Sequence, residues 1–385
     1  MKRLCLTTVP IIFLFLGVKA QVVDVITTGI SKPRNFELLG NDLYFSESRI
    51  NNNPNTGKIS KIDITATNPV VENIVTGLAG PIGIRLIGNE LYVAEHNNLK
   101  LSKIDISIAN PTAVEIFSFL PDPNTGIFIY PETMVNFGNA LYLNSYSPMF
   151  SSGIYKVDIG IDPVAVENIV YFDFTSNDLY TNSISGTALD GNILYFSHTQ
   201  YFGTISSATG KISKIDISST NPVVEEVVSG INNPYQLEIV GNYLYFSLFQ
   251  NGKIQKINLN DANPTIEDVI QGLSGPSGMK VVGNDLYIAQ FLSNKISKLD
   301  VSNDLALSID EFAAPKFTIY PNPTSNYIQV KELNATKAYK VYNVLGVELM
   351  SGIISNTDQI DVSNLKNGLY FLKIEGYSQK KFIKK

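Results

Sequence analysis

The sequence contains almost no cysteine, and this absence restricts both its chemistry and its means of stabilisation. The only cysteine among the 385 residues is Cys5, which lies in a short apolar segment at the N-terminus. The rest of the chain therefore has no disulfide, no thiolate nucleophile and no cysteine ligand for a metal. Its fold must be held together by packing and hydrogen bonds.

Long hydrophobic runs are absent outside the first twenty residues. Lys2 and Arg3 precede a mostly apolar stretch over residues 4–17, which is too short for a transmembrane helix. Val18 and Ala20 supply the small residues of a signal-peptidase site, and Cys5 is not at a lipobox position. We therefore expect a signal peptide over residues 1–20, cleavage before Gln21, and no transmembrane span in the mature chain.

Positive charge is scarce over most of the chain. Residues 21–315 carry 16 Lys and Arg against 30 Asp and Glu, whereas residues 316–385 carry 10 Lys against 5 Asp and Glu. An acidic body lacks the basic face that nucleic-acid phosphates require, so nucleic acid is not an expected partner. The change in the sign of the charge also marks a domain boundary.

One phrase, Gly-Asn-x-Leu-Tyr, occurs six times in this background. Its glycines are 42 to 53 residues apart, at Gly40, Gly88, Gly138, Gly191, Gly241 and Gly283. Repetition at this period indicates an array of supersecondary units. Because Gly and Asn both tolerate positive φ, we expect a tight hairpin turn at each copy, and the Leu-Tyr that follows opens a strand.

The pattern of each repeat predicts four short antiparallel strands. In the second repeat the expected strands cover residues 82–87, 91–95, 99–106 and 113–118. Such units are typical of the blades of a β-propeller. The sixth repeat lacks a fourth strand, but residues 22–29 match residues 70–77 position for position. We therefore predict that the N-terminal strand completes the sixth blade and closes the ring.

The predicted fold is all-β and has two domains. A six-bladed β-propeller covers residues 21–302, a linker covers 303–315, and a small Ig-like β-sandwich with Gly and Pro turns covers 316–385. The repeats resemble the superfamily that includes NHL-repeat, TolB-like, strictosidine-synthase-like and gluconolactonase-like propellers. That resemblance rests on blade number and strand phrasing, without a catalytic motif.

The C-terminal seventy residues resemble the type A sorting domain of the bacterial type IX secretion system. The resemblance is carried, in family order, by residues 319–324 (IYPNPT), 341–346 (VYNVLG), 362–374 (VSNLKNGLYFLKI) and 380–385 (KKFIKK). It implies export across the inner membrane of a diderm bacterium by the signal peptide. The type IX machinery would then engage residues 316–385, and the product would be secreted or displayed on the outer cell surface.

The loops that follow the Leu-Tyr strands vary most between repeats, as loops that carry function on a rigid scaffold do. On a propeller they share one face with the blade-to-blade loops, so we expect their polar residues around the mouth of the central channel. Aromatic residues in these loops are expected to stack on sugars or to anchor a partner protein. The candidate ligand-binding residues are Glu47, Glu95, His96, Ser145, His198, Tyr201, Tyr235 and Gln290.

Glu47 and Glu95 are in addition candidate calcium ligands, because carboxylates suit that ion. The resemblance also implies a metal at this place, because gluconolactonase-like and paraoxonase-like proteins hold a metal at the channel mouth. The blade starts, such as Pro33-Arg34-Asn35 and Pro81-Ile82-Gly83, lack the dense acidic and amide set of those proteins. No cofactor is therefore predicted, and calcium stays an alternative to solvated polar loops around a water-filled channel.

Two functions stay open at this point. The first is a binding or interaction module for a glycan, peptide or protein of unknown identity. The alternative is an extracellular lactonase- or lyase-like enzyme with its site at the channel mouth. The sequence has no Gly-x-Ser-x-Gly elbow and no phosphate-binding glycine loop, so no reaction is specified. A purely structural surface protein is a third reading.

Overall fold

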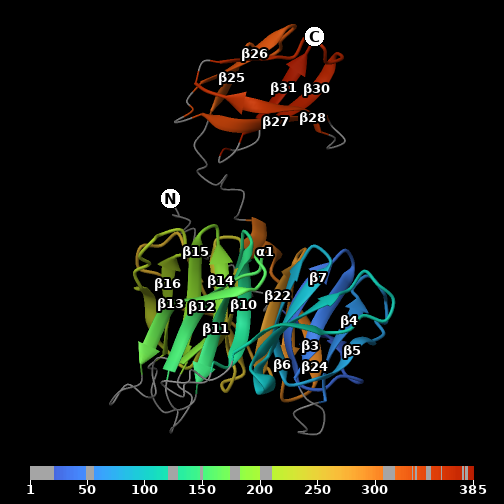
Figure 1. The fold of residues 1–385 in the computed structure, drawn as a ribbon, viewed down its shortest axis with the longest axis vertical. Helices are drawn as coiled ribbons and strands as arrows, with labels where there is room; N and C mark the ends of the chain where they lie inside the picture. The colour runs from blue at the N-terminus through green and yellow to red at the C-terminus, as the bar shows by residue number, and fades with distance from the viewer. Residues whose placement is uncertain are drawn as a thin grey trace, which may run out of the picture. The chain divides into compact units, whose positions relative to one another are not determined.

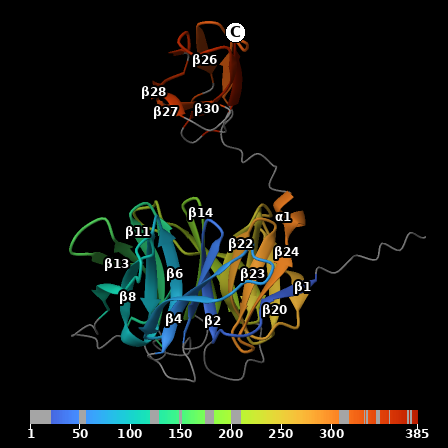
Figure 2. The same cartoon turned by 90° about the vertical axis from the view of Figure 1, so that its right-hand side faces the viewer.

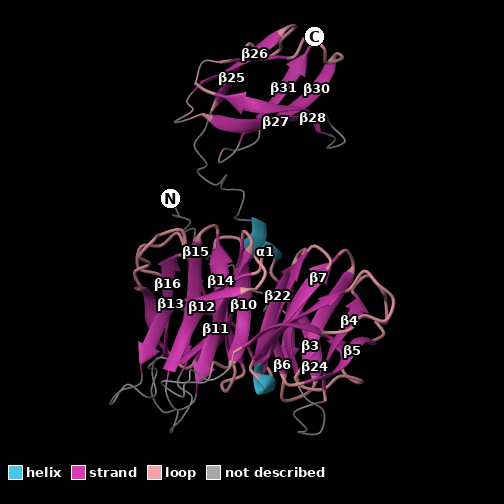
Figure 3. Ribbon diagram, viewed as in Figure 1, coloured by secondary structure: helices cyan, strands magenta, loops and turns pink. Residues whose placement is uncertain are grey.

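The computed structural model of the chain divides into two compact units, Met1–Asp304 and Leu305–Lys385. Strands make up nearly all of the regular structure in both units, as Figure 3 shows. The structure describes residues 21–48, 56–119, 129–147, 151–173, 183–199, 210–306, 317–331, 333, 336–343, 348–356, 358–374, 377 and 380–385.

The described part of the first unit contains six four-stranded antiparallel sheets (Figure 1). Five of them are meanders of consecutive strands: β2 (Pro33–Leu39), β3 (Asp42–Glu47), β4 (Gly57–Asp63) and β5 (Glu72–Leu78); β6 (Pro81–Ile87), β7 (Glu90–Glu95), β8 (Lys100–Asp105) and β9 (Val114–Ser118); β10 (Pro131–Phe137), β11 (Ala140–Ser147), β12 (Ser151–Asp158) and β13 (Ala165–Asp173); β14 (Ser183–Asp190), β15 (Ile193–Thr199), β16 (Gly210–Asp216) and β17 (Glu225–Ile231); and β18 (Pro234–Val240), β19 (Tyr243–Leu248), β20 (Lys253–Asn258) and β21 (Glu267–Gln271).

The remaining sheet combines the two ends of the first unit. It has the order β1-β24-β23-β22, formed by β22 (Pro276–Val282), β23 (Asp285–Gln290), β24 (Lys295–Asp300) and the N-terminal β1 (Val22–Ile26). β1 lies antiparallel to β24, with Val22 opposite Leu299 and Val23 opposite Lys298. The predicted pairing of the N-terminal strand with the last repeat is confirmed, and it covers the edge that β24 would otherwise expose.

The six copies of the repeated phrase form the hairpin between the first two strands of each sheet. All six glycines have positive φ, between 58° and 60°. The asparagines that follow them are not among the residues with positive φ. A two-residue loop with positive φ at its first position only has the type II′ pattern. The hairpins are therefore as predicted, but only the glycine of each pair needs the left-handed region.

The sheets of the first unit are arranged in a propeller-like ring. Their first strands contact one another in the closed order β2, β6, β10, β14, β18, β22 and back to β2. Figure 2 views the unit from the side, with β2 between β6 and β22. The second strands are buried on both faces, as Leu43, Tyr44 and Phe45 of β3 show. Phe45 packs with Tyr287 of β23, so the apolar core lies between neighbouring sheets. The weak alternation of the strand sequences follows from this two-sided burial.

The described residues also form two short helices: the 3-10 helix η1 (His96–Asn98) in the first unit, and α1 (Ser302–Ala306), which spans the boundary after Asp304. The second unit is a β-sandwich of two sheets. One has the order β25-β26-β29, with β25 (Thr318–Tyr320), β26 (Tyr327–Lys331) and β29 (Gln359–Asp361); the other has the order β28-β27-β30-β31, with β27 (Lys337–Asn343), β28 (Glu348–Ile354), β30 (Gly368–Ile374) and β31 (Lys380–Lys384). One apolar cluster that includes Phe317, Leu372 and Phe382 forms its core.

Candidate functional site

A cavity of about 430 Å³ lies at the centre of the ring. Four of its side chains occupy the second position of a first strand, directly after a proline: Arg34, Ile82, Glu132 and Tyr235. Others stand at the end of a second strand or just after it: Ser48, His96, Thr199, Phe249 and Gln250. The cavity therefore opens on the side of the loops that vary between repeats, opposite the glycine turns. This is the face on which the sequence predicts a site.

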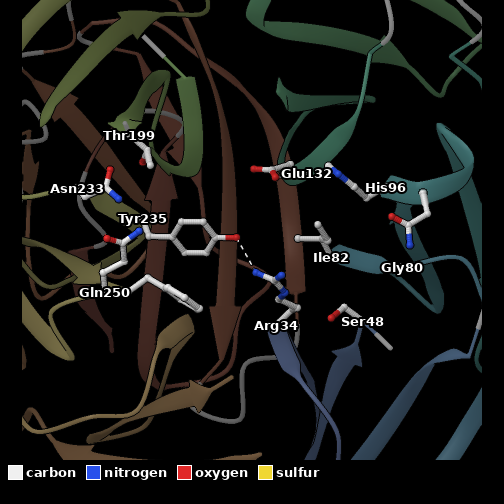
Figure 4. A pocket seen from close by; sticks show the side chains of 12 residues that line it. Arg34, Ser48, Gly80, Ile82, His96, Glu132, Thr199, Asn233, Tyr235 and Gln250 are labelled. Atoms are coloured by element: carbon white, nitrogen blue, oxygen red, sulfur yellow. Dashed lines mark hydrogen bonds and ion pairs between the residues drawn. The ribbon is translucent and has the colours of Figure 1, made fainter. Parts of the chain in front are cut away.

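Arg34 is the positive charge of this cavity. Its Nη1 donates a hydrogen bond to Tyr235 Oη over 2.8 Å, which Figure 4 marks with a dashed line. The guanidinium carbon lies 4.1 Å from the centre of the Phe291 ring, a stacking distance that fixes the plane of the group. Nε is buried and has no hydrogen-bond partner. Arg34 thus has its orientation fixed while part of its donor capacity stays unused.

Glu132 faces the same cavity from the start of β10 (Figure 4). Its side chain is buried, and burial raises its pKa from the ordinary 4.5 to about 7, although the charge of Arg34 and a hydrogen bond with Asn144 oppose the shift. The carboxyl group is therefore close to half protonated at neutral pH. An acid poised in this way can give or take a proton within a narrow pH range.

His96 begins the short helix η1 and lies beside Glu132. Its Nδ1 is 4.0 Å from Glu132 Oε1, which is too long for a hydrogen bond, and Nδ1 has no hydrogen-bond partner. Burial lowers the pKa of His96 to about 4, helped by the charge of Arg34 and opposed by a hydrogen bond with the Pro131 backbone. The imidazole is thus neutral at physiological pH and packs against Tyr130, with ring centres 5.1 Å apart.

The two carboxylates predicted at the channel mouth lie elsewhere, inside separate sheets. Glu47 is fully buried, accepts hydrogen bonds from the Ser31 backbone N–H and from Ser60 Oγ at 2.6 Å, and lies 3.2 Å from Lys58 Nζ. Its oxygens are therefore engaged by its own sheet.

Glu95 repeats the arrangement one sheet further on. It accepts hydrogen bonds from the Ala79 backbone N–H at 2.9 Å and from Ser102 Oγ at 2.6 Å, and it pairs with Lys100 at 3.4 Å. Neither Glu47 nor Glu95 lines the central cavity. The described residues contain no group of three or more His, Cys, Asp or Glu side chains that could hold a metal ion. The alternative of calcium at Glu47 and Glu95 would require two carboxylates that the structure holds in separate sheets, each bonded within its own sheet.

Gln290 and His198 occupy the equivalent position in two further sheets. Gln290 accepts from the Ser274 backbone N–H and donates to Ser297 Oγ at 2.7 Å, and His198 Nε2 is 2.9 Å from Ser213 Oγ. Burial lowers the pKa of His198 to about 3, and the charge of Lys211 adds to the shift. The side chain is fully buried and packs against aromatic rings, so it does not reach the cavity.

The remaining predicted site residues are Ser145, Tyr201 and Tyr235, and they do not all lie at the cavity. Ser145 is buried in β11, where its carbonyl accepts a hydrogen bond from Ser152 Oγ. Tyr201 lies outside the described residues. Of the eight candidates, the structure brings His96 and Tyr235 together at the central cavity. The sequence prediction missed Arg34 and Glu132, although a proline begins the first strand in five of the six sheets and marks the position they share.

A second polar cluster lies along the same channel, in a smaller cavity of about 200 Å³ between the first strands. Glu37 accepts from Arg85 Nη1 at 3.1 Å and from Lys280 Nζ at 3.4 Å, and Arg85 Nε donates to Asn136 at 2.7 Å. Glu238 is buried beside them and accepts a hydrogen bond from the Val281 backbone N–H. Glu37 is paired with both Arg85 and Lys280, as buried structural charges usually are. That pairing distinguishes the cluster from the cavity around Arg34.

Residues 318–385 match the family of secretion system C-terminal sorting domains. The C-terminal unit is therefore a type IX sorting tail, and the chain is a protein that this system delivers to the cell surface or the extracellular space. Within the described residues, no helix is both long and apolar enough to cross a membrane.

Solved structures resemble the chain at low sequence identity. A luciferin-regenerating enzyme is 13% identical with a TM-score of 0.54, over 73% of this chain and 95% of that one. A Thermus thermophilus protein described as a putative oxidoreductase (glucose dehydrogenase) is 12% identical with a TM-score of 0.52, over 73% and 99%. Virginiamycin B lyase from Staphylococcus aureus is 16% identical with a TM-score of 0.46, over 73% and 99%. No curated protein matches the sequence. The likenesses to the first two structures concern the fold alone.

Proposed function

We propose that residues 21–302 form a closed six-bladed β-propeller that acts outside the cell as a binding module, with its ligand site in the central cavity. The six four-stranded sheets are its blades, and the closed order of contacts between their first strands supports this assignment. Residues 1–20 are its signal peptide, 303–315 its linker and 316–385 the domain that engages the secretion machinery.

The observation that carries this proposal is the composition of the cavity. A volume of about 430 Å³ lies in the range of small-molecule sites. Arg34 offers an unmatched donor, Glu132 a carboxyl group that is about half protonated at neutral pH, and His96 a neutral imidazole. Tyr235 and Phe249 form an aromatic wall whose ring centres are 5.6 Å apart. A few converging polar groups beside aromatic surface are typical of a site for a sugar-sized ligand.

A screen of saccharides and small organic compounds by ligand-observed NMR tests the proposal. We expect at least one compound to bind the wild-type protein and to lose most of its affinity for Tyr235→Ala. Tyr171→Ala is the matched control, because Tyr171 is 42% exposed on β13 and does not line the cavity. Equal binding to Tyr235→Ala, or no binding by any compound, would contradict the proposal.

An enzyme that moves a proton in the same cavity is the second candidate. The buried carboxyl of Glu132, whose pKa is about 7, favours it, because a general acid or base works best near the operating pH. Turnover of a lactone panel would then follow a pH profile with an inflection near 7 and would be lost in Glu132→Gln. Binding without turnover of any lactone would leave the binding module as the function.

A further inference from the structure

We infer that the ligand of the central cavity carries a carboxylate on a ring and that Arg34 binds this carboxylate. The inference rests on the proposed function and specifies its ligand class. It starts from a difference between two arginines of the channel. Arg85 forms an ion pair with Glu37 over 3.1 Å and donates from Nε to Asn136. Arg34 forms no ion pair with any described residue, and its Nε has no partner.

A partly buried guanidinium without a counter-ion is costly unless an anion completes it. Arg34 is nevertheless held in place by the Phe291 ring, 4.1 Å from its guanidinium carbon, and by the hydroxyl of Tyr235. Its orientation is thus fixed before any ligand arrives, so little freedom is lost on binding. The planar fork of arginine matches the two oxygens of a carboxylate.

A second cation strengthens the positive potential at this place. Lys32 Nζ lies 4.8 Å from the centre of the Phe291 ring, the same ring that Arg34 stacks on, and Lys32 forms no ion pair within the described part of the chain. The region 21–315 is strongly acidic, with 30 Asp and Glu against 16 Lys and Arg. Lys32 and Arg34 both lie near the Phe291 ring, and neither forms an ion pair among the described residues, although the charge of Arg34 interacts with Glu132. Their positive potential favours a negatively charged group on the ligand.

Glu132 sets how much negative charge the cavity can accept. It is the described carboxyl that lines the cavity with Arg34, and His96 beside it is uncharged at neutral pH. A protonated Glu132 donates a hydrogen bond, whereas an ionised Glu132 repels an anion. One carboxylate therefore balances the charge of Arg34 better than a doubly charged phosphate does. The rings of Tyr235 and Phe249 offer a flat apolar wall to the body of the ligand.

The arginine side chains themselves provide the test, because the chain has only four: Arg3, Arg34, Arg49 and Arg85. With ¹⁵N-arginine labelling, the Nε–H signals of Arg34 and Arg85 are assigned through Arg34→Lys and Arg85→Lys. The probes are matched pairs, D-glucuronate with D-glucuronamide and benzoate with benzamide. The sugar pair and the aromatic pair distinguish a sugar acid from an aromatic acid.

We expect one carboxylate to shift the Arg34 Nε–H signal while its amide does not, and the Arg85 signal to stay in place. Affinity for that carboxylate should fall about tenfold or more in Arg34→Gln, as loss of a charge-assisted hydrogen bond predicts. The inference is overturned if amides bind as tightly as acids, if neither acid binds, or if Arg34→Gln binds equally well. Binding of neutral compounds in the wider screen would then leave the proposed function standing, whereas no binding at all would remove both.

Discussion

Two titratable side chains of the central cavity are shifted in opposite directions by the same cause. Burial raises the pKa of Glu132 to about 7 and lowers the pKa of His96 to about 4. Both shifts favour the neutral form of the group, because a charge is poorly solvated there. Near pH 6 the charge of the cavity is therefore mainly that of Arg34.

This raised pKa predicts a dependence of stability on pH. Glu132 titrates at about 4.5 when unfolded and about 7 when folded. Its protonation stabilises the fold fully below pH 4.5, and this contribution is lost as the pH rises to 7. Glu132→Gln cannot ionise, so it should gain on the order of 2 kcal/mol relative to wild type between pH 5 and pH 8. Urea unfolding of both proteins at the two pH values measures this gain, and an unchanged difference would contradict it.

The buried hydrogen bonds of Glu47 at the end of β3 predict that removing one of them lowers the stability of the fold. Ser60→Ala removes the hydroxyl that donates to Glu47 and leaves a buried carboxylate oxygen without that bond. We expect a loss of about 1–3 kcal/mol in the free energy of unfolding. Ser107→Ala is the control, because Ser107 donates to the exposed Asp105, and it should change the stability by less than about 0.5 kcal/mol. Equal effects would show that the buried tie adds nothing.

The sequence predicted the face of the site better than its residues. Glu47 and Glu95 end their strands in variable loops, which favoured exposure, but the serine of the next strand and the backbone of the preceding loop enclose them. Arg34 and Glu132 occupy equivalent positions in different repeats, but they are different types of residue, so the repeat pattern does not single them out. Their meeting depends on ring closure, which places first strands distant in sequence around one axis.

At the scale of elements, the six hairpins and the closing strand organise the first unit. The hairpins could be predicted because only glycine takes the left-handed φ without strain. The pairing of β1 with β24 could be predicted because residues 22–29 repeat residues 70–77. The type of the hairpin turn could not be predicted, because Gly-Asn is compatible with more than one two-residue turn.

The closing strand predicts a test on stability. Ile26 is buried at the end of β1 and packs in the cluster that contains Phe36 and Tyr287. Ile26→Ala should lower the free energy of unfolding by about 2–4 kcal/mol. Val23→Ala on the same strand is the control, because Val23 is 50% exposed, and it should cost less than about 1 kcal/mol. Similar unfolding midpoints for Ile26→Ala and wild type would exclude β1 as a closing element.

At the scale of the whole molecule, the charge changes sign between the parts of the chain. Residues 316–385, which include the match to the sorting family, carry 10 Lys against 5 Asp and Glu, whereas the body before them is acidic. Both the family motifs and this change could be predicted from the sequence. The ligand that we propose could not be predicted, because the residues that line the cavity come from separate repeats.

The sorting tail predicts where a truncated protein accumulates. Deletion of residues 316–385 should leave a folded propeller in the periplasm, because the first unit has its own core and loses only the export signal. Cell fractionation with circular dichroism on the recovered protein measures both properties. A reporter fused to the signal peptide and residues 316–385 is the control and should reach the outside. Truncated protein in the medium would contradict the role of the tail.

We propose that the ring is a scaffold and that its function lies in the cavity around Arg34. The most direct measurement is a crystal structure of the full chain with the tightest-binding carboxylate of the probe set. We predict the carboxylate within hydrogen-bonding distance of Arg34 and the ring of the ligand against Tyr235. A ligand bound outside the cavity, or in it without contact to Arg34, would contradict the account.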